Sequence, residues 1–244
     1  MERHFDHLLD KLKTKLIKMS TLVNGQVELA LRSVEEGSHE LAKLVIERDA
    51  KVDSYDLKVD KSALKLVALN QPVATDLRFI MSSVIINSNL ERIGDIAVNI
   101  AENAEYFHEK PAFYHRISFH ETAEASREMI RLAADAFTKN DPVTARQVMN
   151  YDNNLDELVK KNFELLIEIM KEDKANIEQA VKLYSIFHCL ERLGDRAVNI
   201  AEYVYYIVEA RIVKRRMAEL PAIDEDTENE PKDESKPGNE EEKS

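Results

Sequence analysis

Apolar residues recur every three to four positions over six segments of the chain, which is the spacing of amphipathic α-helices. The segments are separated by residues that commonly stop or start helices: Gly37-Ser38, Asn70-Gln71-Pro72, Glu109 to Arg116, Asp141-Pro142 and Asn176. The chain holds only 5 glycines and 6 prolines, and 44% of its residues are hydrophobic, which is typical of helical proteins. We therefore predict six long helices, the last one ending near Met217.

One twelve-residue pattern occurs twice, one hundred positions apart. Residues 91–102 read ERIGDIAVNIAE and residues 191–202 read ERLGDRAVNIAE, so ten of the twelve positions are identical. Each copy falls in the third predicted helix of a set of three. The sequence thus predicts an all-α protein built from two tandem three-helix bundles, residues 1–110 and 111–217, that are related by an internal repeat.

The charge of the chain is concentrated in its last residues. Residues 218–244 hold eleven acidic residues and three lysines, which account for −8 of the net charge of −12. Such a segment is too polar to bury a core, so we expect a disordered acidic tail. The remaining −4 is spread over 217 residues and offers no basic excess of the kind that nucleic-acid binding needs, so no nucleic-acid partner is predicted.

Cysteine content and hydropathy indicate the compartment. Cys189 is the only cysteine, so the chain forms no internal disulfide. The N-terminus is too charged for a signal peptide, and no run of about 18 apolar residues could span a bilayer. We expect a cytoplasmic protein that meets a membrane only through its partners.

Polar side chains share one face of the third helix in each set. At about 100° per residue, the acids and amides of each copy fall within roughly 80° of one another. These residues are Glu91, Asp95, Asn99 and Glu102 in the first copy, and Glu191, Asp195, Asn199 and Glu202 in the second. The opposite face of the first copy is predicted to enter the core with Ile86, Leu90, Ile93, Ala97 and Ile100.

A second acidic face follows the neighbouring helix of each set. Its members are Asp49, Asp53, Asp56 and Asp60 in the first half, and Asp152 and Asp156 in the second. Like charges four apart cost a helix about 0.2–0.5 kcal/mol per pair. Carboxylate and amide oxygens converging from two helices suit hard or borderline metal ions, so metal binding is one interpretation. An ordinary solvated acidic surface is the other.

These residues carry a resemblance to the PhoU family of phosphate-uptake regulators over about residues 1 to 217. The ERIGD and ERLGD segments are similar to the family's paired E(D)xxxD metal motifs, and Gln71-Pro72 with Asp76-Leu77-Arg78 resembles its QPxxxDLR segment. The resemblance implies a cytoplasmic, often dimeric protein that represses the phosphate-starvation response. The implied partners are the ATPase side of the phosphate-specific ABC transporter and a phosphate-sensing histidine kinase.

The resemblance also implies a set of metal ligands. The motif positions are Glu91, Asp95, Glu191 and Asp195, complemented from the neighbouring helices by Asp49, Asp53, Asp152 and Asp156, with Asn99 and Asn199 as extensions. The expected cofactors are divalent or trivalent ions of iron, zinc, manganese or magnesium.

Two other functions compete with a metal-binding regulator. Di-metal enzymes on helical bundles use Glu-x-x-His pairs, but Gly94 and Gly194 stand three residues after the motif glutamates. The chain also lacks a glycine-rich phosphate loop, a nucleophile elbow and a CxxC pair, so no enzyme is predicted. A helical scaffold that works without metal keeps the same fold and partners, and it stays open as the alternative.

Overall fold

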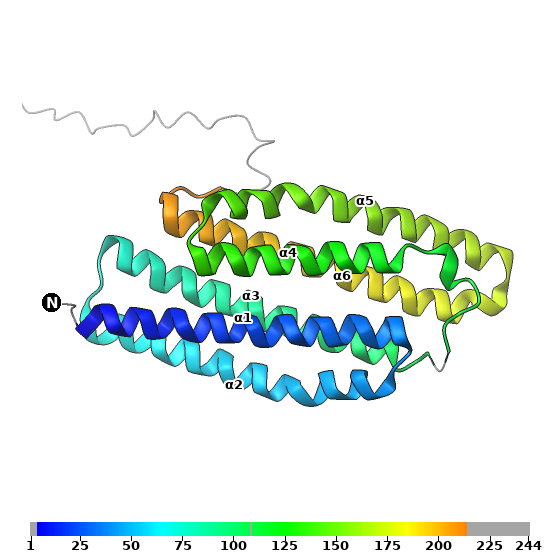
Figure 1. Cartoon of the computed structure of the whole chain (residues 1–244), viewed down its shortest axis with the longest axis horizontal. Coiled ribbons are helices and arrows are strands. Elements are labelled where there is room, and N and C mark those ends of the chain that lie inside the picture. The colour runs from blue at the N-terminus through cyan, green and yellow to red at the C-terminus, as the bar shows by residue number, and fades with distance from the viewer. Residues whose placement is uncertain (1–3, 108, 214–244) are drawn as a thin grey trace, which may run out of the picture. The chain divides into compact units, whose positions relative to one another are not determined.

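The structure is a computed structural model that describes residues 4–107 and 109–213 (Figure 1). Helices are the only regular secondary structure among the described residues, which confirms the predicted all-α class. The six α-helices are α1 (His4–Glu36), α2 (His39–Asn70), α3 (Ala74–Ala104), α4 (Phe119–Lys139), α5 (Pro142–Glu172) and α6 (Ile177–Glu209). Two 3₁₀ turns, η1 (Tyr114–Arg116) and η2 (Lys174–Asn176), lie in the connections.

Capping residues set several of the helix boundaries. Ser38 accepts a hydrogen bond from the N–H of Leu41 at the start of α2. Asp141 accepts hydrogen bonds from the N–H groups of Val143 and Thr144 before the first-turn proline of α5. Both caps satisfy N–H groups that have no partner inside the helix. The boundaries that the sequence predicted at these two places are confirmed.

The end of α6 corrects the prediction that the last helix reaches Met217. The helix ends at Glu209, and Ala210 has a left-handed φ of 56° while its N–H donates to the carbonyl of Tyr206. The next apolar side chain, Ile212, is 62% exposed, whereas Val213 is half-buried against the core without being helical. The basic residues at 214–216 and the predicted acidic tail, 218–244, lie outside the described residues.

The two sets of three helices pack into one body. Helices α1, α2 and α3 contact one another, as do α4, α5 and α6, and α3 packs against α6 where the sets meet. Figure 1 shows α3 and α6 running in opposite directions along this contact. Residues up to Val213 form a single compact unit. The predicted core face of α3 is buried, as expected, at Ile86, Leu90, Ile93, Ala97 and Ile100.

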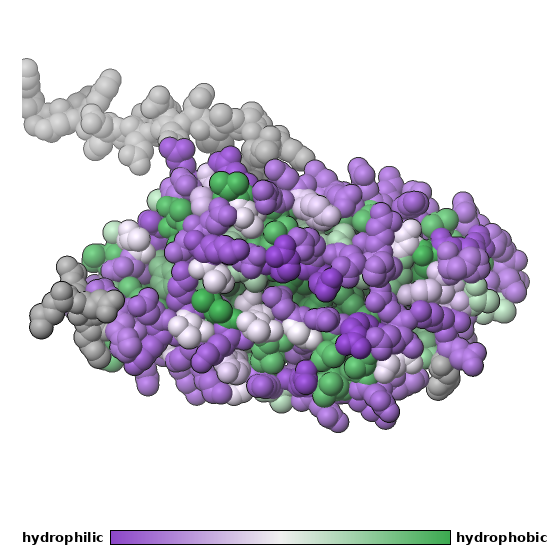
Figure 2. Space-filling model, in the orientation of Figure 1, coloured by the Kyte–Doolittle hydropathy of each residue, from purple (hydrophilic) through white to green (hydrophobic). Residues whose placement is uncertain are grey.

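The surface of this body is mostly polar on the face that Figure 2 shows, where hydrophobic residues are scattered among hydrophilic ones. Within the described ranges, no helix combines the length and the apolar character that a bilayer span requires.

Candidate metal-binding sites

The first repeat brings its two acidic faces together where α2 packs against α3. Burial is the main cause that raises the pKa of Asp49 and of Asp95, and the charge of Asp53 raises both pKa values further. Burial also raises the pKa of Glu91, followed by the charges of Asp95 and Asp56. We call these five residues the first acidic cluster. Their carboxylates are close enough to disfavour one another's charged forms.

The second repeat builds a similar group where α5 packs against α6. The pKa of Asp156 is raised first by burial and then by the charges of Glu191 and Asp195. Burial and Glu191 raise the pKa of Asp195 in turn. With Asp152, which is 1% exposed, these residues form the second acidic cluster. Nδ1 of His188 lies 3.1 Å from a carboxylate oxygen of Glu191.

The glycine of each motif lets the neighbouring helix come close. A Cβ atom on Gly94 would lie 3.0 Å from Cγ1 of Val52 and 3.7 Å from Oδ1 of Asp49. On Gly194 it would lie 2.5 Å from Cδ2 of Leu155 and 3.3 Å from Oδ1 of Asp152. The missing side chain therefore serves helix packing, and the same close approach sets the first aspartate of α2 or α5 against the motif helix.

Three other polar residues of the predicted faces, Asn199, Asn99 and Asp60, have contacts of their own. Nδ2 of Asn199 donates to Oδ1 of Asn89 at 3.4 Å, so Asn199 faces the other repeat. Asn99 is half-buried, and its backbone carbonyl accepts a hydrogen bond from the side chain of Asn103. Asp60 continues the face of α2 and accepts a hydrogen bond from Nδ2 of Asn87 at 3.2 Å.

Two buried amides that the sequence reasoning missed support the first cluster. Gln26 on α1, 1% exposed, donates from Nε2 to Oδ1 of Asp49 at 3.3 Å. Asn87 on α3 is fully buried and donates to Oδ1 of Asp56 at 2.7 Å as well as to Asp60. Asn87 precedes Glu91 by one helical turn, a spacing that could have revealed it. Gln26 has no such signal, because it comes from a distant helix.

The sequence profile of the PhoU domain matches this chain twice, over residues 16–104 and 119–204. The two matches include most of each set of three helices and all residues of both acidic clusters. The chain belongs to the PhoU domain family. The linker that contains Pro111 and η1 falls between the two PhoU domain matches.

Similar proteins carry the PhoU name over most of their length. The chain is 34% identical over 208 residues to a protein of Aquifex aeolicus named phosphate-specific transport system accessory protein PhoU homolog, covering 85% of this chain and 94% of that one. A protein of Zymomonas mobilis with the same name is 31% identical over 218 residues, covering 87% and 90%.

Solved PhoU structures share the fold. The crystal structure of PhoU from Pseudomonas aeruginosa superposes with a TM-score of 0.82 at 31% identity, covering 85% of this chain and all of that one. The phosphate transport system regulatory protein PhoU from Streptococcus pneumoniae gives a TM-score of 0.80 at 25% identity, covering 86% and 100%.

The QPxxxDLR segment of this PhoU chain has a structural task. Asp76 lies in the first turn of α3, where its negative charge interacts favourably with the positive end of the helix dipole. Nε of Arg78 donates to the carbonyl of Ile207 at 3.2 Å, near the end of α6, and its guanidinium lies 5.9 Å from the ring centre of Tyr206. The segment therefore joins the beginning of α3 to the end of α6.

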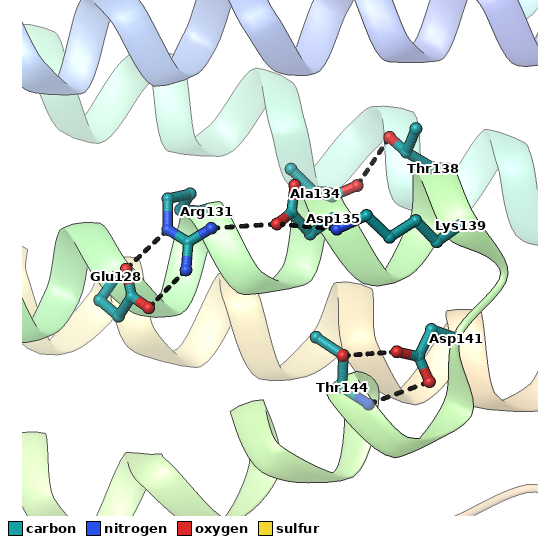
Figure 3. Close-up of polar contacts among 8 residues, drawn as sticks. All are labelled: Glu128, Arg131, Ala134, Asp135, Thr138, Lys139, Asp141 and Thr144. Atoms are coloured by element: carbon teal, nitrogen blue, oxygen red, sulfur yellow. Dashed lines mark hydrogen bonds and ion pairs between the residues drawn. The ribbon is translucent and has the colours of Figure 1, made fainter.

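The acidic clusters differ from an ordinary charged helix face, which α4 illustrates in Figure 3. There Arg131 pairs with Glu128 at 2.6 Å and with Asp135 at 3.0 Å, and Asp135 also meets Lys139. Across the ranges 4–107 and 109–213, no ion pair within 4 Å neutralises Glu91 or Asp95. The first cluster is thus held together without the pairing that normally relieves crowded carboxylates.

The donor atoms fit hard or borderline cations, because they are carboxylate oxygens whose charged forms repel one another. Among the described residues, no three His, Cys, Asp or Glu side chains converge closely enough to hold a metal ion as they lie. Binding would therefore require the acidic side chains to turn toward one another. The residues fit a metal in chemistry and in helix placement, and metal binding stays a prediction.

The raised pKa values predict a pH dependence of stability for the metal-free protein. A carboxyl group whose folded pKa lies above its unfolded value of about 4 stabilises most at low pH, and its contribution falls as pH rises through the folded pKa. Replacing Asp95 and Asp195 by Asn should therefore raise the free energy of unfolding at pH 7 relative to the wild type. The difference should shrink toward pH 4. Urea unfolding from pH 4 to 8 measures it, and a difference that does not vary with pH would contradict the assignment.

Proposed function

We propose that this protein is a metal-binding regulator of phosphate uptake that represses the phosphate-starvation response when phosphate is plentiful. Membership of the PhoU family and the names of its relatives support the link to phosphate transport. The observation that carries the metal-binding part is the duplicated arrangement of an E-x-x-x-D helix packed against a second acidic helix. The motif acids recur in both halves, although other positions, such as Asn87 and Phe187, differ between them.

The proposed partners have different support. Relatives named accessory proteins of the phosphate-specific transport system support an association with the phosphate ABC transporter, which we place on its ATPase side. A phosphate-sensing histidine kinase is the second proposed partner, and it rests on the family resemblance alone. We further propose a cytoplasmic homodimer.

The chain's own residues define what a bound metal would do. A bound cation supplies positive charge that offsets the repulsion among the carboxylates. In the first cluster, Asp49 and Asp53 from α2 would face Glu91 and Asp95 from α3. In the second cluster, α5 and α6 would supply the equivalent residues, Asp152, Asp156, Glu191 and Asp195. Metal binding would then tie the second helix of each repeat to the third, with a role in regulation rather than catalysis.

Deleting the gene in its own organism tests the regulatory role. In phosphate-rich medium, a reporter driven by a phosphate-starvation promoter should rise severalfold in the deletion strain, because repression is lost. A plasmid copy of the wild-type gene should restore the low reporter level. Unchanged reporter activity in the deletion strain, at both high and low phosphate, would refute the proposed function.

A further inference from the structure

The contact between α3 and α6 has a register that brings together arginines from the two repeats. The helices are antiparallel (Figure 1), and the hydrogen bond between Asn89 and Asn199 fixes which residues lie opposite each other. On α3, Arg92 follows Asn89 by three residues. On α6, Arg196 precedes Asn199 by three residues. Both steps advance about 4.5 Å in the same direction, so the two arginines lie at the same level.

Arg192, one turn before Arg196 on α6, completes a group of three guanidinium groups. The charges of Arg92 and Arg192 both act on Arg196, and so does the opposite charge of Asp195. Nε of Arg196 is buried and has no hydrogen-bond partner in the described chain. None of the three side chains forms a hydrogen bond or an ion pair within 4 Å with a residue in the described ranges.

Packing does not explain Arg196. The matching position of the first repeat is Ile96, which is fully buried. An isoleucine can therefore fill this position of the helix packing. Arg196 is one of the two positions at which the twelve-residue copies differ. Asp195 offsets part of this charge, but no ion pair within 4 Å forms in the described ranges. A half-buried guanidinium beside two others therefore still favours a bound anion.

We propose that Arg92, Arg192 and Arg196 form a binding site for a phosphate group on the α3–α6 contact, between the two acidic clusters. Guanidinium groups match the oxygen geometry of phosphate and bind it through paired, charge-assisted hydrogen bonds. The site goes beyond the proposed function, since it consists of arginines and needs no metal. The phosphate group could be free inorganic phosphate or part of a nucleotide, and the two sources can be distinguished by titration.

The neighbouring acids should weaken this site. The charges of Arg192 and Arg92 act on Asp95, and those of Arg196 and Arg192 act on Asp195, so each carboxylate competes with an anion for the same arginines. Removing these two negative charges should therefore tighten phosphate binding. A purely structural role of the arginines would not produce this effect.

Isothermal titration calorimetry on the full chain, stripped of metal, tests the site with inorganic phosphate and, separately, with ATP. Arg196→Ile, which copies the first repeat, should weaken binding of the preferred ligand at least tenfold. The matched control is Arg127→Gln on α4, whose arginine is exposed and paired with Glu124; it should bind like the wild type. Tighter binding of phosphate than of ATP would identify the free anion, and the reverse would identify a nucleotide.

The Asp95→Asn, Asp195→Asn double variant provides the second arm of the experiment. It should bind the preferred ligand several times more tightly than the wild type, and adding Arg196→Ile to it should remove that gain. Circular dichroism should show the same helical content in all variants. The proposal is overturned if neither ligand binds even to the double variant, or if Arg196→Ile binds as tightly as its parent. Failure of the reporter experiment would leave these binding results unaffected.

Discussion

The Asp95→Asn, Asp195→Asn double variant should retain no more than about a tenth of the metal that the wild-type protein holds after equilibration with manganese, iron or zinc. Each substitution replaces a charged oxygen donor in one acidic cluster by a neutral amide. Loss even of groups that only orient a ligand costs about 10- to 100-fold in metal affinity, and loss of a ligand itself should cost at least as much. Elemental analysis of the dialysed proteins by mass spectrometry gives the metal content per chain.

Asp135→Asn is the matched control for this measurement. Asp135 is also a carboxylate on a helix, but it pairs with Arg131 and Lys139 and lies outside both clusters (Figure 3). We expect it to keep the wild-type metal content. Equal metal content in the wild type and the double variant would contradict the clusters as metal sites. Near-zero content in both would favour the scaffold that works without metal.

Gly194→Ala should destabilise the protein by about 1–3 kcal/mol, although alanine is the better helix former. The added methyl group would lie 2.5 Å from Cδ2 of Leu155, a fully buried side chain that would have to shift. Relief of this contact would push α5 away from α6 and separate Asp152 from its cluster. Urea unfolding of the metal-free variant measures the loss.

Gly25→Ala on α1 separates the effect of crowding from that of helix propensity. A Cβ atom at Gly25 meets nothing within 4 Å, so this substitution should stabilise the protein by up to about 1 kcal/mol. If Gly194→Ala were as stable as Gly25→Ala, a glycine at position 194 would not be needed for the packing of α5 against α6. Loss of metal from the second cluster in Gly194→Ala, but not in Gly25→Ala, would show that the close packing of α5 against α6 supports metal binding.

Local signals explain why the fold was largely predictable. Apolar spacing identified the helices, and the caps Ser38 and Asp141 identified two of their boundaries, because both signals act over a few neighbouring residues. The end of α6 could not be predicted in this way. Ala210 adopts a left-handed conformation without being a glycine, and Val213 beyond it packs against the core without being helical.

The candidate site was predictable where it depends on spacing within one helix. The face that carries Glu91 and Asp95 follows from helix geometry, whereas the support from Gln26 depends on how α1 packs against α2. The contacts of Asn199 do not follow from spacing within α6. Its spacing placed it with the acids, but the contact between the repeats engages it with Asn89.

The repeats also differ in a way that their similarity concealed. Asn87 donates to the acids of α2 in the first half, while Phe187, at the matching position, is fully buried with its ring centre 5.9 Å from that of Phe119. The first half therefore extends its polar contacts by a further turn along α2, where the second half has a hydrophobic core. Comparing the two halves beyond the twelve-residue pattern would have revealed this difference.

The most direct test of a metal-binding phosphate regulator is the starvation reporter in the deletion strain that carries the Asp95→Asn, Asp195→Asn double variant. Immunoblotting should first show that the variant accumulates to the level of the wild-type protein. The account predicts that reporter activity in phosphate-rich medium then stays as high as in the deletion strain, while Asp135→Asn restores repression. Full repression by the double variant would contradict the account.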